Sequence, residues 1–402
     1  MSKRYDELDS IRGIASLSVV FHHCFLCFSV FLAAHFHDSV NNTFVKILSN
    51  SPLHIFWAGH EAVILFFILS GFVLSLPFLN NVKQYYPDYI IKRFFRIYTP
   101  YIITVVISGL LFTILKENNS NDLSNWFNQM WSNPITPTAI ISYVFMLGLD
   151  THNLSTTSWS LVHELRISIF FPFIMILVMK FDWKKSLPFG LILTYGPWGV
   201  LSYLGSHIPN KEIAFLFNSF SNTFYYASFF VIGAVLAKYK ETLVGKLNTL
   251  HSKTKFILSV LTIFLYTIEW NISILGNLKY NSKGTQLLIT NLFVDCLIAI
   301  GVLILFVFAL SSIKFQKILK TRFLLHMGKI SYSLYLIHPI ILLLFVYFAK
   351  GVLPLASLFL FVPFLSILIA HFMYIYIEKP SMLLGKKIVQ NKMYIKRFKQ
   401  TA

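Results

Sequence analysis

The stretch LDSIRGIASLSVVFHHC, from Leu8 to Cys24, has the apolar composition of a membrane helix but carries an arginine and two histidines. Ionisable side chains are costly inside a bilayer, and those that occur there usually mark a functional site. Arg12 and His23 are eleven positions apart, which places them within about 20° of one helix face and about 16 Å apart along the axis. His22 is turned about 80° away from Arg12. Each side chain alone is explained by a bond to a neighbouring helix, but their alignment favours a polar cavity along that face.

The composition of the whole chain is that of an integral membrane protein. Of its 402 residues, 56% are hydrophobic and 12% are charged, whereas about 25% of residues are charged in a typical soluble domain. A helix needs about 20 apolar residues to cross a bilayer. The segment Pro137–Leu149 is too short and is interpreted as re-entrant or interfacial. We expect an all-α polytopic membrane protein with about ten transmembrane helices, at residues 11–34, 56–79, 97–115, 159–180, 186–205, 223–237, 256–272, 286–310, 331–349 and 353–377.

The distribution of basic residues predicts the orientation of these spans. If both termini are on one side, that side holds 26 of the 34 Lys and Arg residues, and the opposite side holds 6. Short cytoplasmic segments are enriched in Lys and Arg, so we expect both termini in the cytoplasm. The net charge of +18 then mostly reflects topology, and we expect no nucleic-acid partner.

The chain shows no internal repeat and no soluble domain. We expect residues 1–380 to form one transmembrane domain and residues 381–402 to form a basic cytoplasmic tail that lies against anionic membrane lipids. Cys24, Cys27 and Cys296 lie in apolar runs and indicate no disulfide framework. Cys24 and Cys27 form a CxxC pair, which inside an apolar helix is interpreted as packing rather than as redox chemistry or metal binding.

Two further stretches place polar or small residues near the predicted spans. In KRFFR, from Lys92 to Arg96, Arg93 and Arg96 lie one turn apart at the predicted cytoplasmic start of the third span. Guanidinium groups match phosphate oxygens, so this pair is a candidate phosphate site, although it would also anchor the span. The stretch FFILSGF holds Ser70 and Gly71 in the second span, where small residues let helices approach closely.

Two more stretches lie at the ends of later spans. TTSWSLVHEL, residues 156–165, carries Glu164 at the predicted non-cytoplasmic mouth of the fourth span, close to Trp159 and Ser160. GKISYSLYLIHP, residues 328–339, begins a span at the predicted cytoplasmic face. Residues three or four apart share a helix face, which aligns three polar side chains of this span: Ser331, Tyr335 and His338.

Together these motifs resemble the acyltransferase-3 family of integral-membrane acyltransferases, bacterial proteins that mostly O-acetylate glycans. The resemblance extends from Leu8 to Pro380, with the motifs in the family's order: the Arg-x10-His pair of Arg12 and His23, LSGF, the Arg-x-x-Arg pair, WSLxxE and SYxxYLxH. The chain departs from the family in carrying His22 where an apolar residue is usual. The choice of His23 over His22 therefore rests on its spacing from Arg12.

The resemblance implies an enzyme of the cytoplasmic (inner) membrane that transfers an acyl group, usually acetyl, from acyl-coenzyme A to a hydroxyl of a glycan or glycolipid. It implies that Arg12, Arg93 and Arg96 bind the phosphates of coenzyme A. His23 is the expected general base, and Glu164 is expected to orient a histidine or bind the acceptor. No metal is expected. The other motif residues are expected to bind substrate or support the site: Ser70, Gly71, Trp159, Ser160, Ser331, Tyr335 and His338.

Two other functions fit parts of the sequence. A proton-coupled transporter would use a relay of ionisable residues, although the chain shows no inverted repeat or paired broken helices. The relay would consist of Arg12, His23, Glu164, Asp295 and His338. In a scaffold or sensor, the Arg-x10-His alignment would be a coincidence. For an acyltransferase, direct transfer and a transiently acylated His23 both stay open, and no residue identifies the glycan, the acyl group or the oligomeric state.

Overall fold

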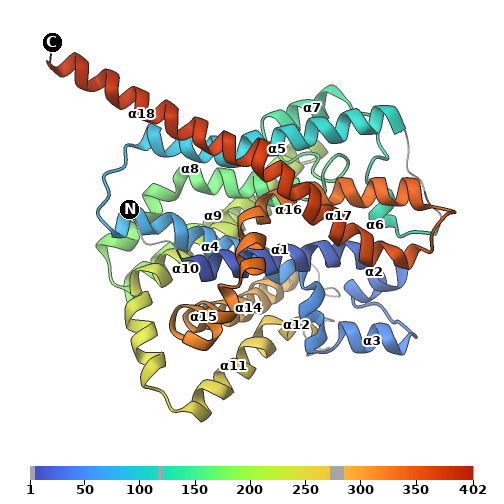
Figure 1. Ribbon diagram of the computed structural model, residues 1–402, viewed down its shortest axis with the longest axis horizontal. Coiled ribbons are helices and arrows are strands. Elements are labelled where there is room, and N and C mark those ends of the chain that lie inside the picture. Colours follow the sequence, from blue (N-terminus) through green and yellow to red (C-terminus); the bar gives the residue numbers. More distant parts are fainter. Residues whose placement is uncertain (1–4, 116–119, 121, 272–284, 402) are drawn as a thin grey trace.

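The computed structural model describes residues 5–115, 120, 122–271 and 285–401. These residues form helices and turns without a strand, which confirms the all-α fold (Figure 1). The first half contains α1 (Asp6–Leu26), α2 (Ser29–His35), α3 (Thr43–Ser49), the 3-10 helix Pro52–Trp57, α4 (Gly59–Leu79), α5 (Tyr86–Leu115), α6 (Asn125–Asn128), α7 (Pro137–Val144) and α8 (Ser158–Lys180). The second half contains α9 (Trp183–His207), α10 (Lys211–Thr249), α11 (Ser252–Tyr266), α12 (Ile268–Asn271), α14 (Thr285–Ser311), α15 (Ile313–Leu319), α16 (Arg322–Ala349), α17 (Leu358–Met373), a π-helical turn at Tyr374–Glu378 and α18 (Lys379–Thr401).

Seven of the described helices are long and apolar enough to cross a membrane, and an eighth span results if α1 and α2 are counted together. This confirms a polytopic membrane protein. Helices α9 and α11 occupy the predicted spans 186–205 and 256–272 but are not among the seven. The count of ten spans and the orientation of the termini therefore stay predictions.

The first predicted span, 11–34, is not one helix. Helix α1 ends at Leu26, and the chain bends by 117° into α2. The last carbonyl groups of a helix need hydrogen-bond partners, and the loop before α6 supplies them. The hydroxyl of Ser124 donates to the Leu26 carbonyl at 2.5 Å, and the Ser124 backbone N–H donates to the Cys27 carbonyl at 2.8 Å. The apolar composition continues past the bend because α2 packs on a separate small core around Trp57.

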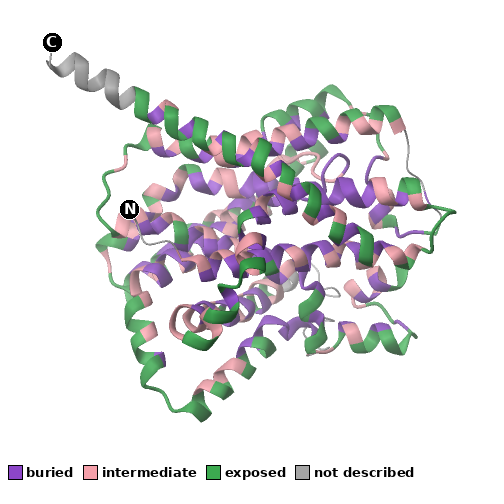
Figure 2. Ribbon diagram, viewed as in Figure 1, coloured by how far each residue is buried: buried purple, intermediate pink, exposed green. Residues whose placement is uncertain are grey.

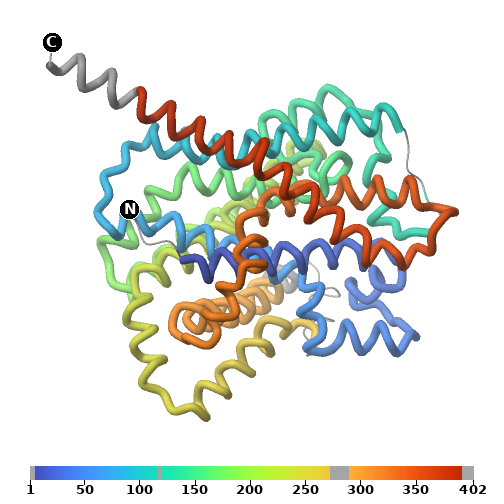
Figure 3. The backbone as a smooth tube through the Cα atoms, in the orientation of Figure 1, coloured from blue at the N-terminus to red at the C-terminus, as the bar shows by residue number. Residues whose placement is uncertain are grey.

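Other boundaries also differ from the predicted ones. Helix α5 begins at Tyr86, so Arg93 lies two turns inside a helix rather than before one that starts at residue 97. The short predicted span 223–237 is the middle of α10, which has 39 residues. The predicted tail 381–402 begins within α18, which continues from α17 through the π-helical turn and packs against α5 (Figure 3).

Two close helix contacts position the site. Helices α1 and α16 pack side by side, and a Cβ atom added at Gly13 would lie 2.6 Å from the backbone nitrogen of Gly328. Only glycines at these positions let the two backbones come so close. Helices α4 and α10 meet in the same way, because a Cβ atom at Gly71 would collide with the carbonyl of Phe230. The small residues of the second span thus permit the close approach predicted for them.

The outer helix faces are apolar. Figure 2 shows buried residues along the central helices α1, α4, α10 and α16, and exposed residues on the outer faces. Large apolar side chains lie on those faces, such as Ile192 on α9, which is 66% exposed, and Phe256 on α11, which is 69% exposed. Exposed apolar surface on this scale suits a lipid environment. Cys24 and Cys27 are fully buried in the core, consistent with their interpretation as packing residues.

Candidate active site

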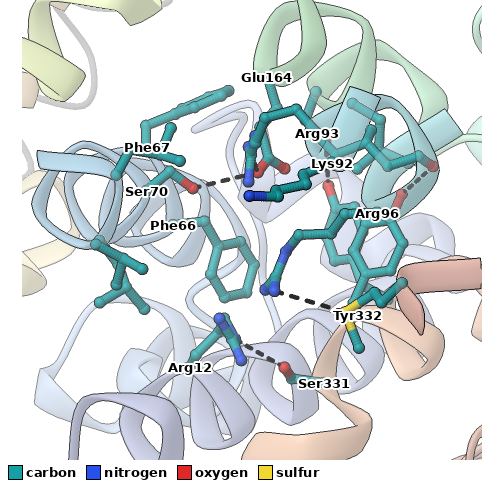
Figure 4. Close-up of a pocket in the computed structure, with 18 of the residues that line it drawn as sticks. Arg12, Phe66, Phe67, Ser70, Lys92, Arg93, Arg96, Glu164, Ser331 and Tyr332 are labelled. Atoms are coloured by element: carbon teal, nitrogen blue, oxygen red, sulfur yellow. Dashed lines mark hydrogen bonds and ion pairs between the residues drawn. The ribbon is translucent and has the colours of Figure 1, made fainter. Parts of the chain in front are cut away.

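One cavity between the helices is strongly basic. It has a volume of about 360 Å³ and lies among α1, α4, α5, α8, α16 and α18. Among its described lining residues, Glu164 is the one acid. Figure 4 shows the Arg12, Arg93 and Arg96 side chains converging on one space together with Lys92. We call this the basic cavity. Its five cationic residues are Arg12, Lys92, Arg93, Arg96 and Lys386.

Arg93 is held in place by a dense set of hydrogen bonds. Its Nη2 donates to Glu164 Oε1 at 3.0 Å and to Ser168 Oγ at 2.8 Å, and its Nε donates to the same Ser168 oxygen at 3.1 Å. The Ser70 hydroxyl donates to Glu164 Oε1 at 3.3 Å. Arg93 and Ser70 thus both bind Glu164, so three of the predicted site residues come together on three different helices.

The position of Glu164 differs from the predicted one. We expected it at the non-cytoplasmic mouth of its span and Arg93 at the cytoplasmic end of another, yet the two side chains form an ion pair. One reason is the start of α5, which begins at Tyr86 rather than at residue 97, whereas α8 begins within one residue of the predicted span. Arg93 is two turns inside α5, and Glu164 is the seventh residue of α8, so both lie within the bundle. A charge at this depth is tolerated because the opposite charge compensates it.

The other two predicted arginines are held differently. Arg12 donates from Nε to Ser331 Oγ at 2.9 Å and from Nη2 to the Gly328 carbonyl at 3.2 Å, and it pairs with Asp9 at 3.0 Å. Ser331 and Arg12 thus lie side by side in the wall of the basic cavity. Arg96 points its Nη1 toward the Met382 sulfur at 3.8 Å. A sulfur is a weak acceptor, which leaves the Arg96 guanidinium better able to bind an anion than Arg93.

The second cavity has a different chemical character. It has a volume of about 680 Å³, and its described lining residues include no Lys, Arg, Asp or Glu. Indole, amide and hydroxyl groups complete its walls, among them those of Trp126, Gln129, Trp159 and Tyr335. We call this the imidazole cavity. Five histidines line it: His22, His23, His35, His60 and His152.

His23 makes a hydrogen bond that fixes its tautomer. Nδ1 of His338 lies 3.0 Å from the Leu334 carbonyl, which only accepts, so that nitrogen carries a proton. In a neutral ring, Nε2 of His338 then accepts, and it lies 2.7 Å from Nδ1 of His23. His23 therefore donates from Nδ1, and a neutral His23 ring keeps a lone pair on Nε2. That is the arrangement that a general base requires.

The two cavities meet at Tyr335 and Val63, which line both of them. The hydroxyls of Tyr335 and Ser160 lie 2.7 Å apart, and the Tyr335 ring is 6.1 Å from the His338 ring. Arg12 and His23 thus share a face of α1 but open onto different cavities, rather than onto the single cavity that their alignment suggested.

Some residues of these cavities escaped the sequence analysis. Lys92 stood beside Arg93 in KRFFR and was visible there as a third cation. Trp126, on the four-residue helix α6, and His152 come from the segment between α5 and α8, where no long periodic pattern signals a cavity. His22 also faces the imidazole cavity, but its Nδ1 donates to the Trp57 carbonyl at 2.9 Å. The proposed transporter relay is split, because Glu164 pairs with Arg93 whereas His23 pairs with His338.

The described part of the chain contains no group of three or more His, Cys, Asp or Glu residues placed to hold a metal ion. Residues 5–375 match the family whose description is "Acyltransferase domain", the acyltransferase-3 family. Comparison with curated proteins found no match. Comparison with solved structures found none either.

Proposed function

Since this chain belongs to the acyltransferase-3 family, we propose that it is a membrane O-acyltransferase that moves an acyl group, acetyl in the simplest case, from acyl-coenzyme A to a hydroxyl of a cell-envelope or extracellular glycan. One observation carries the proposal: a basic cavity and an uncharged imidazole cavity meet at Tyr335, close to the His23–His338 pair. This arrangement suits an anionic donor on one side and a hydroxyl acceptor on the other. We place the enzyme in the cytoplasmic membrane, where acyl-coenzyme A is available.

The basic cavity is suited to the donor. Coenzyme A carries phosphates, and charge-assisted hydrogen bonds from guanidinium groups are among the strongest that proteins make with phosphate. Arg12 and Arg96 line this cavity, with the exposed side chain of Lys386 at its rim. Phe66 and Phe67 add apolar wall, against which the uncharged arm that carries the thioester would pack. Arg93 is bound to Glu164 and Ser168 and shapes the cavity as well as charging it.

The chemistry falls to His23. Its Nε2 takes the proton of the acceptor hydroxyl while that oxygen attacks the thioester carbonyl. The carbon–sulfur bond breaks, and the coenzyme A thiolate receives the proton from His23. The hydroxyls of Ser160 and Tyr335, at the boundary between the cavities, are the donors best placed to stabilise the oxyanion. An acylated His23 would use the same nitrogen, so both routes stay open.

The proposal is tested by following free thiol released from acetyl-coenzyme A by the purified protein, together with mass spectrometry of surface glycans from cells with and without the gene. We expect thiol release and an acetyl mass difference that depends on the gene. His23→Ala should lose about 10²–10⁴-fold in transfer, the usual contribution of general acid–base catalysis, while still binding coenzyme A. A transporter or a scaffold would show neither thiol release nor glycan acetylation.

A further inference from the structure

A buried carboxylate stands behind one wall of the imidazole cavity. Asp295 of α14 is 2% exposed. Its Oδ2 accepts a hydrogen bond from the Tyr225 hydroxyl of α10 at 2.6 Å, and its Oδ1 lies 2.7 Å from Nε2 of His60 at the start of α4. Three helices thus join at one carboxyl group. None of these three residues belongs to a motif that the family resemblance rests on.

This network fixes the His60 ring. A carboxylate only accepts, so Nε2 of His60 carries the proton of the 2.7 Å bond. A buried carboxylate is costly unless such hydrogen bonds compensate it, which means that Tyr225 and His60 keep Asp295 in place and Asp295 in turn keeps the imidazole oriented. The His60 side chain is 29% exposed and lines the imidazole cavity. Asp295 therefore acts on the cavity through His60.

Aromatic rings provide another part of the cavity wall. The Trp126 ring centre lies 4.8 Å from that of His23, and the Trp126 carbonyl accepts from Nε2 of His152 at 3.1 Å. Trp159 and Gln129 line the same space. A cavity of about 680 Å³ is within the usual range for a small-molecule site, and such sites combine apolar walls with a few well-placed polar groups.

We propose that the imidazole cavity binds one neutral sugar ring of the acceptor, with Trp126 against the ring face and His60 bound to a different hydroxyl from the one that faces His23. This rests on the proposed function. The aromatic wall suits the C–H face of a sugar, and the imidazoles suit its hydroxyls. The described lining residues hold no Lys or Arg to neutralise an acidic sugar. His60 and Trp126 are thus acceptor-binding residues, and Asp295 is a positioning residue that acts through His60.

The test uses the purified full chain in nanodiscs with radiolabelled acetyl-coenzyme A. The acceptors are the methyl glycosides of glucose, galactose, mannose, rhamnose and N-acetylglucosamine, and those of glucuronic and galacturonic acid. We expect transfer to at least one neutral glycoside and none to the uronic acids. His60→Ala and Trp126→Ala should each raise the KM for that glycoside about tenfold or more, since tenfold corresponds to one lost hydrogen bond or contact of about 1.4 kcal/mol. The KM for acetyl-coenzyme A should not change.

Conservative variants separate binding from folding. Trp126→Phe keeps an aromatic face and should retain most of the affinity for the glycoside. Asp295→Asn should raise the same KM by a smaller factor than His60→Ala. Trp183→Ala, on the exposed start of α9, and His251→Ala, in the exposed turn before α11, serve as controls that should leave every constant unchanged.

Several outcomes overturn the proposal and leave the proposed function standing: preferred transfer to a uronic acid, an unchanged glycoside KM in both alanine variants, or thiol release into water without transfer to any neutral glycoside. A change in the KM for acetyl-coenzyme A alone would instead assign the cavity to the donor. Absence of thiol release under all conditions would overturn the proposed function itself.

Discussion

The hydrogen bond between His23 and His338 makes a prediction about two substitutions of similar size. In His338→Gln, the amide oxygen can still accept from Nδ1 of His23, whereas His338→Leu offers no acceptor. We expect His338→Leu to lower kcat about 10–100-fold, as loss of the orienting partner does for metal-bound histidines, and His338→Gln to recover a large part of that loss. The KM for acetyl-coenzyme A should be unchanged in both. Equal loss in both variants would show that His338 only fills space.

The arginines of the basic cavity should respond differently to truncation. Within the described residues, the Arg96 guanidinium donates to the Met382 sulfur, a weak acceptor, at 3.8 Å, so Arg96→Ala should fold normally. Loss of a charge-assisted bond of about 1.5–3 kcal/mol would raise the KM for acetyl-coenzyme A about 10–100-fold. Arg93→Ala strands Glu164 without its partner and should reduce the yield of folded protein. The affinity for coenzyme A and the yield of folded protein in detergent are measured for both variants. A folding defect in Arg96→Ala, or a normal yield with weaker coenzyme A binding in Arg93→Ala, would contradict the prediction.

The sequence identified individual residues of the site but not which residues contact each other. Helical periodicity placed Arg12 and His23 on one face of a helix, and both lie on α1, although they line different cavities. Their partners Ser331 and His338 lie 319 and 315 positions further along the chain, and no local pattern pairs residues at that distance. The ion pair between Arg93 and Glu164 was missed for the same reason.

The contact between α1 and α16 depends on glycine. A Cβ atom at Gly13 would lie 2.6 Å from backbone atoms of Met327 and Gly328, so Gly13→Ala should push the two helices apart and destabilise the protein by about 1–3 kcal/mol, as overpacking does. Thiol release should fall as well, because the same contact brings His23 to His338. Gly199→Ala on α9 is the matched control, since nothing lies within 4 Å of its added Cβ. The prediction fails if both variants melt at the wild-type temperature.

The segment between α7 and α8 should be sensitive to pH through His152. Burial lowers the pKa of His152 below its ordinary value of 6.5, against a smaller opposite effect of its bond to the Trp126 carbonyl. A lowered histidine pKa means that the unfolded state binds the proton more readily, so stability decreases as the pH falls below about 6.5. The melting temperature of the wild type should therefore fall more than that of His152→Gln between pH 8 and pH 5. Parallel curves for the two proteins would rule out this contribution.

Element boundaries show why hydropathy alone was insufficient. The apolar run that contains α1 continues to Ala34, yet the helix stops at Leu26, where Ser124 from a distant loop satisfies its carbonyls. Conversely, α5 begins at Tyr86, ahead of the predicted span 97–115. Hydropathy indicates which residues can lie in the hydrocarbon of a bilayer. The ends of a helix also depend on hydrogen-bond partners from distant parts of the chain, which hydropathy does not predict.

On the scale of the whole molecule, the distribution of basic residues predicts the side from which the donor enters. The excess of 26 over 6 basic residues predicts cytoplasmic termini. Two of these 26 residues, the exposed Lys92 near the start of α5 and the exposed Lys386 on α18, line the basic cavity. The basic cavity would then open toward the compartment that contains acyl-coenzyme A.

Cysteine labelling in intact cells tests this orientation. The sequence predicts that a cysteine near Asn118 would be labelled from outside, but Asn118 lies outside the described residues. We therefore choose the exposed Asn133, before α7, for the outer side. The exposed Lys317 of α15 serves for the cytoplasmic side. Cys24 and Cys27 are buried and should not react, and Cys296→Ala removes the partly exposed third thiol. In that background Asn133→Cys should react with a membrane-impermeant maleimide from outside, and Lys317→Cys should react only after the membrane is opened. If Lys317→Cys reacts from outside and Asn133→Cys reacts only after the membrane is opened, the basic cavity faces the outside, away from any acyl-coenzyme A. That result would contradict both the predicted orientation and the proposed direction of transfer.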